Sequence, residues 1–194
     1  MRRLGGSAAN EQFTAVVAAV LVPLLLAEAA TLLNVRALLT VHAFVGMLLV
    51  PVVALKLAST GWRMLSYYRG AHEYVLRGPP HVAARMLVAP ALVASTVLLF
   101  GTGIALLAMH QTQGTVVGLH KASFVVWAGA FGIHFLTRLG LLWRTLQIRM
   151  PGISLRLVAA TLSVVAGVGL ATLTLPAMEH LQDNVSRQVG FDSE

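Results

Sequence analysis

The stretch LLTVHAFVGMLLVPVVALKLA, residues 38–58, decides the fold of this chain. It contains only two ionisable side chains, His42 and Lys56, and nearly all of its other residues are apolar. A helix rises about 1.5 Å per residue, so about 20 such residues cross the roughly 30 Å of hydrocarbon in a bilayer. The stretch is therefore predicted to be a transmembrane helix.

Four further stretches have the same character, and they predict an all-α, polytopic membrane bundle of about five transmembrane helices. The expected spans are residues 13–34, 38–58, 86–109, 117–137 and 155–175. Residues 1–12 form a leader, residues 13–176 the bundle and residues 177–194 a polar tail. With 57% hydrophobic and 11% charged residues, the chain is too apolar to cover a water-facing surface. Spans two to five are expected to form the core, with span one packed outside.

The positive charges lie on alternate connections. Of the 14 Lys and Arg residues, eleven precede span one or lie around the connections between spans two and three and between spans four and five. Only Arg36, Lys121 and Arg187 lie on the opposite side. Cytoplasmic loops carry the excess of Lys and Arg, so the amino terminus is expected inside the cell and the carboxyl terminus outside, in the plasma (inner) membrane. The formal charge of +7 then faces lipid headgroups, and nucleic acid is not an expected partner.

The first span has an alternative interpretation. Residues 1–3, the apolar run after them and the Ala-Glu-Ala of residues 27–29 could form a cleaved signal peptide. The apolar run continues through residues 32–33, which favours a retained span. The chain has no cysteine, which excludes disulfides and thiolate metal sites.

Three histidines lie inside predicted spans, where a polar group costs several kcal/mol unless it is satisfied. His42 lies about four residues below the outer end of span two, and His120 about three below that of span four. Both spans run inward, so the two rings are expected at one depth, where they could bind one haem iron from opposite sides. Gly46, one turn after His42, would leave room for a porphyrin. Alternatively, the histidines anchor neighbouring helices and Gly46 serves helix packing.

His134 follows His120 by fourteen residues, which is about 40° short of four helical turns and about 21 Å along the axis. The two therefore share a face, a spacing that would suit two haems on one helix. At the matching position of span two stands Lys56, so a second haem lacks an evident ligand. Lys56 itself, or His72 from the inner loop, could fill that place. His134 would then ligate a second haem or be an alternative ligand to the first. Lys56 is expected to extend toward the cytoplasmic headgroups.

Three charged residues lie near the outer level of His42. Glu28 is the only acidic residue inside a span, and it could orient a ligand histidine or accept a proton from a quinol. Arg36 and Lys121 could pair with haem propionates, or they could be ordinary surface charges.

The segments Leu39-Thr40-Val41-His42-Ala43-Phe44-Val45-Gly46, Leu119-His120-Lys121-Ala122-Ser123-Phe124 and Ile133-His134-Phe135 resemble small membrane-bound b-type cytochromes. The resemblance covers about residues 38–140 and extends to ferric-reductase-like and quinol-oxidising cytochromes. It implies a helical bundle with haem between transmembrane histidines, so that His42, His120 and His134 would ligate iron. Lys56 departs from a di-haem pattern, and one haem near the outer face is the firmer expectation.

The expected function is therefore electron transfer by haem b, between a quinol or an inner donor and an extracytoplasmic acceptor. The chain could be the cytochrome b subunit of an oxidoreductase, with a cytoplasmic or extracytoplasmic redox subunit as partner. No flavin or nicotinamide fingerprint is present. The alternative is a cofactor-free membrane protein, a transporter or an accessory subunit, whose histidines transfer protons or pack helices. Five spans do not divide into inverted halves, which argues against a transporter.

Overall fold

A computed structural model describes residues 7–75, 87–147 and 153–191 of the chain, and these residues are almost entirely helical. The helices are α1 (Ser7–Thr31), a 3-10 turn η1 (Leu32–Asn34), α2 (Leu39–Tyr68), α3 (His72–Val75), α4 (Ala89–Met109), α5 (Thr115–Gln147), α6 (Ile153–Leu173) and α7 (Leu175–Phe191). Within the described ranges, five helices are long and apolar enough to cross a membrane. The prediction of a helical membrane bundle is confirmed at this level.

The helix bounds differ from the expected spans in several places. The helix α5 continues to Gln147, ten residues beyond the expected end of its span. The helix α1 already begins at Ser7, within the expected leader, whose first six residues lie outside the described part of the chain. The helix α2 continues to Tyr68, ten residues beyond the expected end of its span. The tail, expected only as polar, forms the helix α7, because Met178 and Leu181 give it an apolar face that packs on the bundle.

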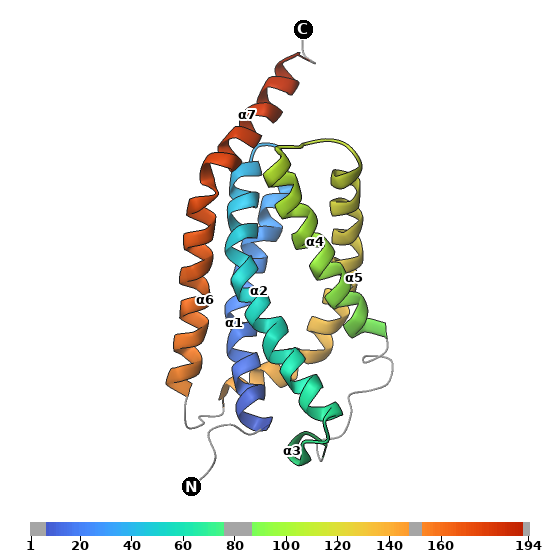
Figure 1. Ribbon diagram of the computed structural model, residues 1–194, viewed down its shortest axis with the longest axis vertical. Coiled ribbons are helices and arrows are strands. Elements are labelled where there is room, and N and C mark those ends of the chain that lie inside the picture. The colour runs from blue at the N-terminus through green and yellow to red at the C-terminus, as the bar shows by residue number, and fades with distance from the viewer. Residues whose placement is uncertain (1–6, 76–86, 148–152, 192–194) are drawn as a thin grey trace.

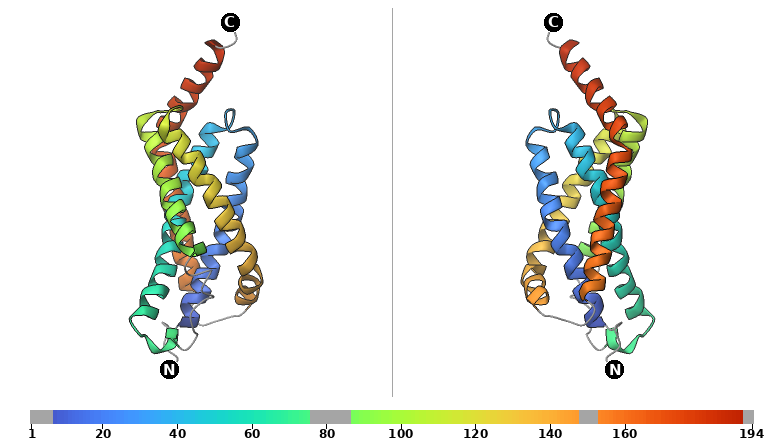
Figure 2. Two further views of the ribbon diagram at one scale, coloured as in Figure 1. Left: turned by 90° about the vertical axis from the view of Figure 1, so that its right-hand side faces the viewer. Right: turned by 90° about the vertical axis from the view of Figure 1, so that its left-hand side faces the viewer.

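The long helices run up and down, so the two ends of the chain lie at opposite ends of the bundle (Figure 1). We name as the upper end the one that carries the connections 32–38 and 110–114, and as the lower end the one where α1 begins. The helix α7 continues beyond α6 and projects from the upper end, as both views in Figure 2 also show.

Four helices form a closed ring. The helix α1 packs on α2, α2 on α4, α4 on α5, and α5 on α1. The helices α2 and α5 therefore lie at opposite corners of this ring. The helix α6 packs outside it, mainly on α2, and α7 covers the upper part of α2. The expectation that span one is the outer helix is wrong, because α1 completes the ring and α6 takes the outer place.

Close packing between α2 and α6 depends on one glycine. A Cβ added at Gly167 would collide with the backbone carbonyl of Leu48, so only glycine allows this approach. On the ring side of α2, the buried residues Leu49 and Val52 pack with Val17 and Leu21 of α1. These two contact surfaces hold α2 between α1 and α6, and they fix which face of α2 points into the ring.

Candidate functional site

His42 of α2 and His120 of α5 meet inside the ring, near the upper end. Their ring centroids are 6.4 Å apart and their planes are inclined by 86°. The two helices stand at opposite corners of the ring, so the imidazoles approach each other across its interior. The structure thus brings together the two histidines for which the sequence predicted a common depth in the membrane.

The Nδ1 atom of His42 is held by α1. It lies 2.9 Å from Oε1 of Glu28 and 3.0 Å from Oγ1 of Thr31. The Thr31 hydroxyl donates its only proton to the Glu28 carbonyl oxygen at 2.6 Å, so toward His42 it can only accept. Both neighbours are acceptors, which assigns the proton to Nδ1 and leaves the lone pair of the neutral ring on Nε2.

The Nδ1 atom of His120 is held by α4 in a similar way. It lies 3.1 Å from the Leu99 carbonyl oxygen, which can only accept, and 3.0 Å from Oγ1 of Thr102. The Thr102 hydroxyl donates to the Leu98 carbonyl oxygen at 2.6 Å. His120 therefore has the same tautomer as His42, with its Nε2 lone pair available.

Gly103 makes room for the His120 ring. A Cβ at this position would lie 3.2 Å from Cε1 of His120, closer than ordinary van der Waals contact. The ring cannot move away freely, because its Nδ1 is bonded to two groups of the same helix α4. The absence of a side chain at Gly103 thus helps to set the position of the imidazole.

The donor set fits a metal that needs two imidazoles from the protein. An imidazole nitrogen binds a first-row metal at about 2.0 Å, so two rings on opposite sides of one metal have centroids roughly 6 Å apart. The observed 6.4 Å agrees with this separation. No group of three or more His, Asp or Glu side chains arranged for a metal occurs among the described residues. A haem iron needs no such group, since the porphyrin supplies its other four ligands.

Glu28 contacts His42 through only one of its two carboxyl oxygens. Its side chain is 19% exposed, and Oε1 makes the bond to His42. The Oε2 atom is buried, and no hydrogen-bond partner for it occurs in the part of the chain that is described. A Cβ added at Gly46 would lie 3.7 Å from Oε1, so the open side of Gly46 faces this carboxyl group. Of the two roles expected for Glu28, the contact with His42 fits the one in which it orients a histidine.

Arg36 and Lys121 are both exposed at the upper end. No hydrogen bond or ion pair within the described ranges joins either side chain to His42 or His120. The backbone oxygen of Arg36 accepts a hydrogen bond from Nε2 of Gln182 at 2.9 Å, and Oε1 of Gln182 accepts one from the Thr40 backbone N–H at 3.3 Å. Gln182 of α7 thereby caps the first turn of α2, which contains His42.

His134 and Lys56 lie toward the lower end, and both are partly buried. The Nζ atom of Lys56 donates a hydrogen bond to the Thr14 carbonyl oxygen of α1 at 2.7 Å. A charged amine inside an apolar helix bundle needs such an acceptor, so this bond ties Lys56 to α1. The expectation that Lys56 extends toward the headgroups stays a prediction. No hydrogen bond to the His134 ring is seen within the described ranges.

Sequence reasoning missed Thr31, Thr102 and the Leu99 carbonyl group, which orient the two imidazoles. A usable signal existed, because Thr31 is the last residue of α1 and Thr102 lies seven residues before the end of α4, close to the levels of His42 and His120. In comparisons with known proteins, no family model, no curated protein and no solved structure matches the chain.

Proposed function

We propose that the chain is a membrane electron-transfer protein that binds haem b between His42 and His120. The observation that carries the proposal is the pair of facing imidazoles with centroids 6.4 Å apart. It is supported by the hydrogen bonds that engage both Nδ1 atoms and leave both Nε2 atoms for a metal. Simple helix packing does not require this agreement between two rings from different helices.

The residues around each ligand would hold it ready for the metal. Glu28 and Thr31 keep the His42 ring from turning, and Leu99 and Thr102 do the same for His120. An acceptor bound to Nδ1–H raises the basicity of the ligating Nε2 and fixes the direction of the ring. The Glu28 carboxylate makes the bond on the His42 side charge-assisted, whereas the acceptors of His120 are neutral. Haem b supplies a one-electron redox couple when it is bound.

The charge distribution supports a direction for the bundle. The lower end carries the excess of Lys and Arg, so we place it in the cytoplasm and the His42–His120 level near the extracytoplasmic face of the plasma membrane. Arg36 and Lys121 are exposed at that face and are the cations available for the haem propionates. Electrons would pass between a quinol or a cytoplasmic donor and an extracytoplasmic acceptor, with the chain as a cytochrome b subunit.

The visible spectrum of the full chain, purified in detergent from cells supplied with a haem precursor, tests the proposal. We expect a sharp Soret band that shifts on reduction with dithionite, and a pyridine haemochrome assay that gives one haem per chain. A protein that stays colourless under these conditions would overturn the haem proposal and favour a cofactor-free membrane protein. A ratio of two would show that the lower level also binds haem, against the single-site proposal.

A further inference from the structure

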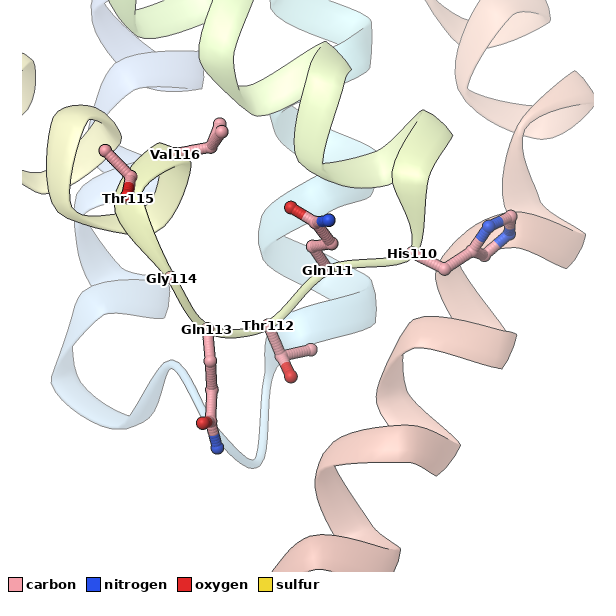
Figure 3. Close-up of a pocket in the computed structure, with 7 residues that line it drawn as sticks. All are labelled: His110, Gln111, Thr112, Gln113, Gly114, Thr115 and Val116. Atoms are coloured by element: carbon pink, nitrogen blue, oxygen red, sulfur yellow. The ribbon is translucent and has the colours of Figure 1, made fainter.

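A second pair of histidines meets at the upper end, outside the helix ring. His110 ends α4, and its imidazole lies against that of His180 of α7, with ring centroids 5.0 Å apart and planes inclined by 73°. Both side chains are exposed. Figure 3 shows the His110 ring projecting from the 110–114 connection toward the C-terminal part of the chain, while the other labelled side chains point elsewhere. The proposed electron carrier makes no use of this pair.

The backbone holds His110 in an unusual conformation. Its φ is +52°, in the left-handed region, where Gly and Asn are the common residues at the end of a helix. It is the only non-glycine residue with positive φ in the described ranges. A strained position of this kind costs free energy and is a reason to ask what its side chain does. Here the strained residue directs an imidazole at a second imidazole.

The other ring is held by buried contacts of its own helix. Met178 is 0% and Leu181 5% exposed, and they flank His180 along α7. Both belong to the apolar cluster that joins α7 to α2, α4 and α6. The next residue of α7, Gln182, accepts a hydrogen bond from the Thr40 backbone N–H at the start of α2. His180 is therefore held by a helix that is fixed to the bundle, although its own side chain is exposed.

The spacing of the two rings fits adjacent positions on one metal ion. With metal–nitrogen bonds of about 2.0 Å and a tetrahedral angle, two imidazole centroids lie roughly 5 Å apart. The observed 5.0 Å matches this value, as 6.4 Å matched ligands on opposite sides. The amide nitrogen Nδ2 of Asn184 lies 3.4 Å from Nδ1 of His180. With the amide nitrogen and oxygen of Asn184 exchanged, the oxygen would accept a hydrogen bond from Nδ1–H and leave Nε2 for the metal.

We propose that His110 and His180 form a binding site for a divalent transition-metal ion that prefers imidazole nitrogen, of the class of Zn²⁺ and Cu²⁺, with water in the remaining positions. Imidazole ligands favour these ions over Mg²⁺ and Ca²⁺, which take oxygen ligands. A bound ion would join the α4–α5 connection to α7, and through α7 it would brace the end of the bundle at which α2 begins.

Metal titration of the full chain in detergent tests the site. The chain is purified with an affinity tag that contains no histidine. We expect one equivalent of Zn²⁺ to bind by calorimetry and Cu²⁺ to give an electron paramagnetic resonance spectrum with two imidazole nitrogens. His110→Ala and His180→Ala should each weaken binding roughly tenfold or more. The control is His72→Ala, which removes an exposed histidine of α3 and should leave the titration unchanged.

Thermal unfolding provides a second readout that does not depend on haem. Zn²⁺ should raise the unfolding temperature of the parent chain and of His72→Ala, because an ion that binds only the folded state stabilises it, and it should not raise that of His110→Ala. Equal Zn²⁺ affinity in the parent chain and in the double variant His110→Ala/His180→Ala would overturn the site. So would a copper signal that persists in the double variant and is lost in His42→Ala.

Discussion

The upper and lower levels of the bundle are built from the same two helices at the same spacing, yet they differ in chemistry. At the upper level α2 provides His42 and α5 provides His120, and fourteen residues further along each helix stand Lys56 and His134. The upper pair meets, with both Nδ1 atoms engaged by neighbouring helices. At the lower level Lys56 is bound to the Thr14 carbonyl oxygen, and no acceptor fixes the His134 ring within the described ranges. The same fourteen-residue spacing on the two helices therefore does not produce the same arrangement of side chains at both levels.

The difference lies in the helices that flank each level. Beside His42, α1 offers Glu28 and Thr31, which are acceptors for an imidazole N–H. Near Lys56, the same helix offers a backbone carbonyl group, which suits an ammonium. A ligand ring needs a second residue that fixes its tautomer and direction. The upper level has such residues on both sides, so we infer one haem and not two.

The largest expected effect comes from removing one histidine at each level. His120→Ala and His42→Ala should abolish the haem spectrum, because each takes away one of the two proposed haem ligands. His134→Ala should keep the spectrum and the stoichiometry of the parent chain. Haem content by pyridine haemochrome, with circular dichroism as the control for folding, checks all three variants. Equal loss in His134→Ala and His120→Ala would break the distinction between the two levels.

A smaller effect is expected from filling the space beside the His120 ring. Gly103→Ala should destabilise the haem-bound protein by about 1 kcal/mol, because its Cβ would press on a ring that Thr102 and Leu99 hold. Gly101→Ala is the matched control, two residues earlier on the same helix, where a Cβ meets nothing within 4 Å. Thermal unfolding and haem retention in detergent measure both. If the two variants behave alike, Gly103 has no part in placing His120.

The smallest effect is expected at the lower level. Lys56→Met removes the bond to the Thr14 carbonyl oxygen and also removes a charge from an apolar environment. Because these two contributions oppose each other, we expect a change in stability below about 1 kcal/mol and an unchanged haem spectrum. Detergent unfolding and the reduced-minus-oxidised difference spectrum measure these quantities. A lost or shifted haem band in this variant would place Lys56 in the cofactor site.

The sequence by itself determined the membrane helices and the common depth of His42 and His120. Both follow from local quantities, the length of an apolar run and the rise per residue of a helix. They do not depend on which helices become neighbours. The helical form of the tail was beyond this reasoning, since polar residues near a membrane surface do not show a span-like pattern.

Only the tertiary structure decided that α1 belongs to the ring, that α6 lies outside it, and that Thr31 and Thr102 orient the two imidazoles. The physical reason is that lipid is as apolar as the interior of the bundle, so hydrophobicity alone does not tell which face of a membrane helix points inward. That choice came from specific contacts such as Gly167 against Leu48 and Lys56 against Thr14. These contacts join residues more than forty positions apart, and no local pattern reveals them.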